Sequence, residues 1–175
     1  ICCWQFVLPI RNSELIMAMT LVQTVTVGAG SPINIEFTNI PQTGKDLLIK
    51  FSLRCSSTTA NFDFYKNGSG GSSGSRVLRG NGSTASSSTG ASPLINNSTE
   101  TANTFTNTEF YIPNYTQAIN HSYSMDSVTE NNATAANQEI LAGRFGFNSA
   151  AATSIKIDVG GGFAQHSTAS LYIIS

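Results

Sequence analysis

Alternation of apolar and polar residues is the dominant pattern along this chain, and it predicts β-strands. The clearest example is the segment 47–53, where apolar residues alternate with Lys50 and Ser52. Successive side chains of a strand point to opposite faces, so this segment predicts a strand with one buried face. The apolar residues on that face are Leu47, Ile49, Phe51 and Leu53.

The C-terminal segment shows the same alternation at residues 155–159, and three glycines at 160–162 then interrupt it. A closing strand follows at 171–174, which we expect to lie in the core. Both of its faces are apolar, since Tyr172 and Ile174 alternate with two aliphatic residues. One sheet can cover only one face, and lone soluble proteins generally avoid sizeable apolar patches. We therefore predict that Tyr172 and Ile174 contact a partner subunit or lie under another segment of the chain.

Further alternating runs, bounded by turn residues, complete the pattern. They lie at residues 21–27, 33–37, 62–65, 75–79, 104–112, 119–128 and 139–147. Together they indicate about ten short strands separated by turns. The sequence thus predicts an all-β fold, an antiparallel two-sheet β-sandwich with a jelly-roll-like topology. The sequence shows no convincing helix, and residues 133–142 allow one or two helical turns at most.

Two segments differ from the rest in composition. Residues 66–104 are rich in Gly, Ser, Thr and Asn, which bury too little area to offset the entropy of ordering them, so we expect one or two long surface loops. Residues 1–16 hold the only Trp and two of the three Cys. We interpret them as a reading-frame overrun before Met17 or Met19 that is dispensable for folding, with a docking arm as the alternative. The remaining residues, 17–175, are predicted to form one domain.

Charge is sparse, because only 11% of residues are charged and the net charge is −1. Nucleic-acid binding needs clustered Lys and Arg, and so does a polybasic membrane patch, so we expect neither partner. No run approaches the roughly 20 apolar residues of a membrane-spanning helix.

Candidate chemistry is correspondingly thin. The two histidines, His121 and His166, lack metal-ligand spacing, and we expect both at the surface. Cys55 is expected to be a small buried hydrophobe. The pattern G-x-S-x-G is matched once, by residues 70–74, but inside a Gly/Ser-rich run and not at a strand-to-helix turn, and the sequence contains no Gly-Lys-Ser/Thr phosphate loop. We therefore predict no enzymatic activity, no metal and no cofactor.

Three tyrosines are candidate glycan-stacking residues, because a pyranose face packs on an aromatic ring. They are Tyr111, Tyr115 and Tyr123. The alternative, which we favour, is that these rings pack within strands.

Four segments of the chain carry a resemblance to a known family. These are VTVGAGSPINIEFTNIPQTGKDLLIKFSLR (25–54), FYIPNYTQ (110–117), DSVTENNATAANQEILAGRF (126–145) and ATSIKIDVGGGFAQHSTASLYII (152–174). They resemble a family of small virion proteins of tailed bacteriophages, of the type found in marine and cyanobacterial phages. The resemblance covers most of residues 20–174. It implies a structural role in the virion and brings no catalytic residues with it.

Two functional hypotheses follow from the resemblance. The first is a non-enzymatic virion protein, capsid-decorating or otherwise attached to the particle exterior. It would work as a homo-oligomer, with a trimer favoured, and its other partners would be virion proteins. The second is a tail-fibre or host-recognition module that binds surface polysaccharide. Both place the protein in the virion. The low-charge, hydroxyl-rich composition suits a protein that stays soluble at high local density.

Overall fold

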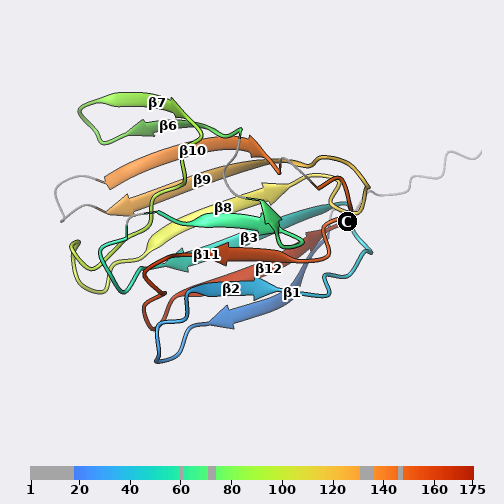
Figure 1. Cartoon of the computed structure of the whole chain (residues 1–175), viewed down its shortest axis with the longest axis horizontal. Coiled ribbons are helices and arrows are strands. Elements are labelled where there is room, and N and C mark those ends of the chain that lie inside the picture. Colours follow the sequence, from blue (N-terminus) through green and yellow to red (C-terminus); the bar gives the residue numbers. More distant parts are fainter. Residues whose placement is uncertain (1–17, 60, 71–73, 131–135, 146–147) are drawn as a thin grey trace, which may run out of the picture.

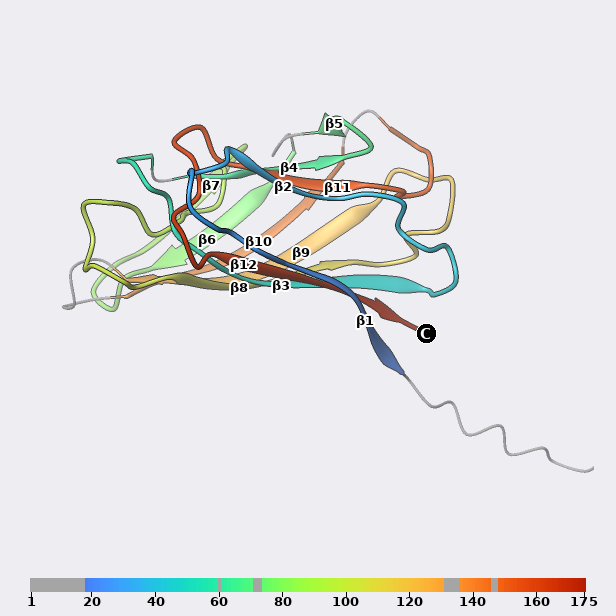
Figure 2. The same ribbon diagram turned by 90° about the horizontal axis from the view of Figure 1, so that it is seen from below.

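The computed structural model describes residues 18–59, 61–70, 74–130, 136–145 and 148–175. Every regular element in these ranges is a β-strand, and the strands form two antiparallel sheets of eight and four strands. The sheets lie one above the other, as Figures 1 and 2 show. The predicted all-β, two-sheet fold is therefore confirmed, whereas the jelly-roll topology stays a prediction.

The larger sheet has the order β1-β12-β3-β8-β9-β10-β6-β7. The bounds of its strands are β1 (Met19–Thr26), β12 (Thr168–Ile174), β3 (Asp46–Leu53), β8 (Thr106–Ile112), β9 (Ser122–Glu130), β10 (Ala136–Arg144), β6 (Arg76–Gly80) and β7 (Ala85–Thr89). The smaller sheet has the order β2-β11-β4-β5. Its strands are β2 (Asn34–Phe37), β11 (Ile155–Asp158), β4 (Asp63–Lys66) and β5 (Ser69–Gly70).

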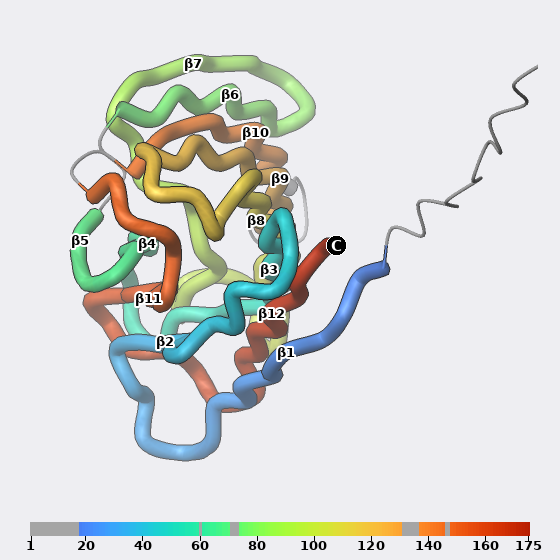
Figure 3. The backbone as a smooth tube through the Cα atoms, turned by 90° about the vertical axis from the view of Figure 1, so that its right-hand side faces the viewer, coloured from blue at the N-terminus to red at the C-terminus, as the bar shows by residue number. Residues whose placement is uncertain are grey.

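The first four strands of the chain alternate between the two sheets. Each of the last two strands then pairs between two of these four. β11 lies between β2 and β4, and β12 lies between β1 and β3. Figure 3 shows the C-terminal strand beside β1 and β3. As expected, the closing strand is a core element, because Leu171 and Ile173 are buried. Residues 1–17 lie outside the described residues, so the interpretations of the leader stay predictions.

The core lies between the inner faces of the two sheets and is rich in aromatic rings. The face predicted for 47–53 is confirmed, since all four of its apolar residues are buried. Phe51 contacts Phe62 edge-on, with 5.6 Å between ring centroids, and Phe64 stacks on Phe110 at 3.9 Å. Such pairs add roughly 0.5–1.5 kcal/mol beyond the area they bury. Cys55 is fully buried, as predicted.

The prediction of long surface loops at 66–104 is wrong in part. Besides the strand predicted at 75–79, which is β6, the segment contains β5 and β7, and Val77, Ile95 and Asn96 are buried. Polar groups of the segment are hydrogen-bonded to β8: the backbone N–H of Asn96 donates to Thr106 Oγ1 at 2.7 Å, and Thr106 Oγ1 donates to Asn96 Oδ1 at 3.0 Å. Polar composition therefore does not prevent ordering here, because ladders and side-chain bonds replace the missing apolar contacts.

The one or two helical turns that the sequence allows at 133–142 are absent where the chain is described, because residues 136–142 belong to β10. In this strand Glu139 and Leu141 are buried on the inner face, while Gln138 and Ile140 point outward. Pairing with both β9 and β6 outweighs the helical propensity of the Ala and Gln residues. Residues 133–135 lie outside the described residues.

Candidate binding face

The outer face of the eight-stranded sheet is the surface on which the candidate functional residues come together. This face is turned away from the four-stranded sheet, so its side chains are exposed or half-buried. Pairing register aligns them in rows that cross the sheet. One row runs Ser170, Lys50, Glu109, Asp126, Ile140, Leu78, Ser87 from β12 to β7.

A second row on this face is apolar and aromatic. Leu21 lies opposite Tyr172, Tyr172 opposite Leu48, and Leu48 opposite Tyr111. Met19 and Ile174 pair beside this row at the end of β1 and β12. We call these six residues, Met19, Leu21, Leu48, Tyr111, Tyr172 and Ile174, the aromatic cluster. Met19 and Leu21 are 53% and 52% exposed.

Tyr111 is held rigidly within the aromatic cluster. Its hydroxyl donates to Asp46 Oδ2 at 2.7 Å, and the backbone N–H of Asn114 donates to Asp46 Oδ1 at 2.8 Å. Burial, together with the neighbouring Asp46 carboxylate, raises the pKa of Tyr111 to about 12. The phenol therefore stays protonated at physiological pH and keeps its hydrogen bond, which fixes the ring on the face.

The structure separates the five residues singled out from the sequence. Tyr172 and Ile174 lie half-buried on the outer face, and Tyr111 lies with them. Tyr115 is fully buried, and its hydroxyl donates to Pro41 O. Tyr123 is also buried, its ring 5.0 Å from the rings of Phe110 and Phe145. Tyr115 and Tyr123 thus pack in the core and present no face to a glycan.

A second apolar area on the outer face was not singled out from the sequence. Leu78, Ile140 and Val128 are 60%, 55% and 41% exposed, and Leu78 lies directly opposite Ile140. They form the floor of a hollow of about 540 Å³ between β9, β10 and the β6–β7 hairpin. The sequence did contain a sign of this area: in an alternating strand, an aliphatic residue such as Ile140 stands at a position where a polar, outward-facing residue is expected.

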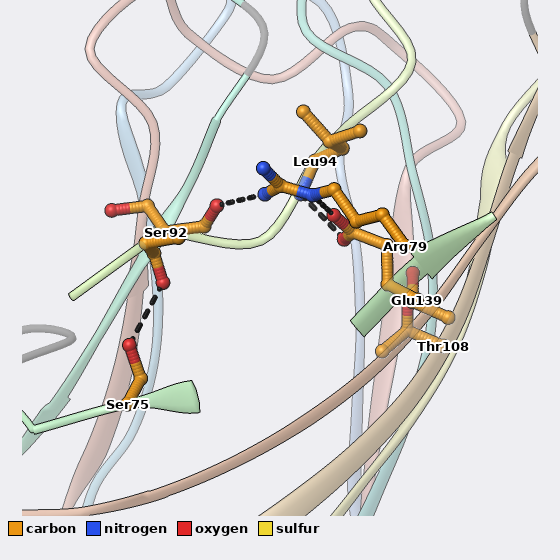
Figure 4. Close-up of polar contacts among 8 residues, drawn as sticks. Ser75, Arg79, Ser92, Leu94, Thr108 and Glu139 are labelled. Atoms are coloured by element: carbon orange, nitrogen blue, oxygen red, sulfur yellow. Dashed lines mark hydrogen bonds and ion pairs between the residues drawn. The ribbon is translucent and has the colours of Figure 1, made fainter. Parts of the chain in front are cut away.

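The inner side of this hairpin is anchored by a partly buried ion pair, drawn in Figure 4. Arg79 Nε donates to Glu139 Oε1, and Arg79 Nη2 donates to the carbonyl of Ser92 at 2.8 Å. The other carboxylate oxygen of Glu139 accepts the backbone N–H of Leu94 at 2.8 Å. The Glu139 side chain is fully buried. These bonds tie β6, β10 and the segment 92–94 together and so fix the floor of the hollow.

One buried polar network joins a lysine and a histidine, two residue types that also occur in catalytic sites. Lys66 is fully buried, and its ammonium donates to His121 Nδ1 at 2.8 Å and to the carbonyls of Asn148 and Ala150 at 2.6 and 3.0 Å. His121 Nε2 lies 3.0 Å from the carbonyl of Asn114, which makes it the protonated ring nitrogen. Every donor is used internally, so the network fastens the segment 148–150 to β4.

The predicted surface position of His121 is therefore wrong, whereas His166 is exposed as expected. The burial of His121 could not be predicted from the sequence, because its hydrogen-bond partner is a lysine 55 residues away. Burial, and then the Lys66 cation, lower the pKa of His121 despite its bond to Asn114.

We expect this histidine to make stability depend on acidity. Its folded pKa lies below the unfolded value of about 6.5, so the unfolded chain binds more protons as pH falls below that value. The stabilisation is fully present above about pH 6.5 and declines at lower pH by up to about 1.4 kcal/mol per pH unit. Urea unfolding at several pH values from 5 to 8 measures the slope. It should flatten in His121→Gln and persist in His166→Gln; equal slopes in wild type and His121→Gln would contradict the assignment.

Comparison with protein-family models, with curated protein sequences and with solved structures gave no match to this chain. The class that the structure itself defines is an all-β, two-sheet antiparallel protein. Within the described residues, no His, Cys, Asp and Glu side chains gather in a group of three that suits a metal ion. The same part of the chain contains no helix long and apolar enough to cross a membrane.

Proposed function

We propose that the protein is a non-enzymatic structural component of a bacteriophage virion, attached to the particle exterior as a capsid-decorating protein. The resemblance of residues 20–174 to small virion proteins supports the virion assignment. The aromatic cluster on the outer face of the large sheet is the observation that supports assembly. Its residues come from four neighbouring strands, β1, β12, β3 and β8, so their apolar atoms form one continuous area.

A second copy of the chain is the partner that we propose for the aromatic cluster. Contiguous apolar area on a soluble protein generally marks an interaction surface. Most soluble oligomers are symmetric assemblies of one chain, and we favour a trimer here. Tyr172 and Ile174 are then interface residues. Leu21 and Leu48, the cross-strand neighbours of Tyr172, extend the same interface.

Light scattering at micromolar concentration tests self-assembly. The expected result is a mass that is a multiple of the 18.5 kDa chain, three times for the favoured trimer. Tyr172→Ser and Ile174→Ser should shift the mass toward one chain, because each removes apolar area from the interface. Ile33→Ser, which changes a residue 55% exposed in the turn before β2, should leave the mass unchanged. A monodisperse single chain in the wild type would overturn the proposed assembly.

A tail-fibre or host-recognition module that binds surface polysaccharide is the second candidate function. The observation that favours it is the position of Tyr111, whose fixed ring lies on the open face beside Ser124 of β9. A glycan array with wild type and Tyr111→Leu distinguishes the two. Ring-dependent binding supports recognition, whereas no binding together with an oligomeric mass supports the structural role.

A further inference from the structure

The hollow beside the β6–β7 hairpin has an apolar floor, and two acidic residues lie next to that floor on β9 and β8. Leu78 lies opposite Ile140 in the pairing register, Ile140 opposite Asp126, and Asp126 opposite Glu109. A ligand group that rests on Leu78 and Ile140 therefore has a carboxylate at the next strand. Val128 and Gln138 line the same hollow one row further along β9 and β10.

The remaining lining of the hollow comes from the β6–β7 hairpin. Gly80, Gly82 and Ala85 line it at the turn, together with Arg79, which is paired with Glu139. A second hollow of about 370 Å³ shares Leu78 and Ile140 and extends along Ser87–Thr89, with Arg76, which donates to the carbonyl of Ser75, also in its lining. All five residues of β7 are exposed and uncharged. The partly buried Arg79–Glu139 pair holds the hairpin in place, which makes the hollow a pre-formed surface.

The carboxylate next to the floor, Asp126, has no ion-pair partner in the described part of the chain. Lys50 Nζ pairs with Glu109 at 2.7 Å, and Arg79, which lines the hollow, pairs with Glu139, so neither cation pairs with Asp126. Asp126 and Glu109 also lie directly opposite each other, and like charges in that position destabilise a sheet. A positive charge from outside would relieve this repulsion, which gives the hollow a charge preference.

We propose that this hollow docks a segment of another protein that presents an apolar side chain next to Lys or Arg. The apolar side chain would cover Leu78, Val128 and Ile140, and the cationic head would bind Asp126 in a charge-assisted hydrogen bond. Lys and Arg suit the site further because their aliphatic stems pack on apolar surface while the head stays at the carboxylate. This surface lies on β9, β10 and β6, whereas the aromatic cluster lies on β1, β12, β3 and β8.

Methyl-detected NMR of the full chain tests the docking chemistry with defined peptides. The probes are acetyl-Ser-Leu-Arg-Ser-amide and its counterpart acetyl-Ser-Leu-Glu-Ser-amide. With the arginine peptide we expect the methyl signals of Leu78, Val128 and Ile140 to shift on titration. The glutamate peptide should bind about tenfold more weakly or not at all, the factor expected when a hydrogen bond to a charged group is lost.

Variants locate the binding. Asp126→Asn should weaken the arginine peptide about tenfold, and Ile140→Thr should weaken both peptides. The matched controls are Asp158→Asn, which removes the same charge from β11, and Ile119→Thr, which changes an aliphatic residue 46% exposed before β9. Neither control should alter the titration.

Three results would overturn the docking proposal. They are the absence of methyl shifts with the arginine peptide, equal binding of both peptides, and shifts of these methyls by soluble dextran or mixed-linkage β-glucan instead of peptide. Repeating the titration on Tyr172→Ser separates this test from self-assembly. Binding there is expected to match wild type whether or not the chain forms oligomers, so the two proposals fail independently.

Discussion

Phe51→Ala is expected to lower the free energy of unfolding by roughly 3–5 kcal/mol, the usual cost of removing a buried aromatic ring. Phe51 is 3% exposed and points from β3 into the space between the sheets. Its ring contacts Phe62 at 5.6 Å and Phe64 at 5.9 Å, so the substitution opens a cavity against the smaller sheet. Urea unfolding at pH 7 measures the loss.

The neighbours of Phe51 along β3 are its natural controls, because they point to the outer face. Ser52→Ala and Lys50→Ala should each cost less than about 0.5 kcal/mol, as is usual for surface substitutions. Equal losses at Phe51 and at these two positions would mean that β3 is buried on both sides. The assignment of an inner and an outer face would then be wrong.

Arg79→Met is expected to cost a comparable roughly 3–5 kcal/mol, because it leaves the Glu139 carboxylate buried without its cation. Leu94 N would remain as a donor to that carboxylate, which a single backbone N–H does not neutralise. The substitution also removes the bond to the carbonyl of Ser92. Urea unfolding gives the total cost, and hydrogen exchange of β6 amides shows whether the hairpin loosens first.

Lys50→Met is the matched control for the ion pair. It breaks the Lys50–Glu109 pair, whose side chains are 45% and 55% exposed. Exposed pairs of this kind contribute about 0–1 kcal/mol, so the loss should be small. If Arg79→Met cost no more than Lys50→Met, the Arg79–Glu139 pair would not be the anchor of the hairpin.

Strands with a buried apolar face were predictable from the sequence, because alternation reports directly which side of a sheet is covered. The segment 47–53 and the strand at 155–158 are clear cases, and both have the predicted faces. The hairpin formed by β6 and β7 was not predictable in the same way. Its second strand, Ala85–Thr89, carries no buried side chain and is held by pairing with β6 alone.

The buried polar residues were the other feature beyond reach of the sequence. Lys66, His121 and Glu139 each depend on a partner more than 50 residues away, or on backbone carbonyls and N–H groups. Composition places such residues at the surface by default. Only the tertiary arrangement shows that their hydrogen bonds are satisfied inside.

The candidate face was anticipated in part. Tyr172 and Ile174 were predicted to be interface residues because apolar side chains at outward-facing positions of a strand are expected to be covered by another surface. The same reasoning applies to Ile140 and Leu78, but the first lay in a segment that also allowed a helical turn and the second in a short run within a segment of loop-like composition. Cross-strand register, which joins these residues into rows, is a property of the fold and not of any one segment.

The central claim, that this chain is an assembled exterior component of a virion, is tested most directly by its copy number and position in purified phage particles. Quantitative mass spectrometry and cryo-electron microscopy of the particles provide both. We predict many copies at symmetry-related exterior positions, with the aromatic cluster around Tyr172 covered by a neighbouring copy. Absence of the protein from particles, or a single copy whose outer sheet face is open to solvent, would contradict the claim.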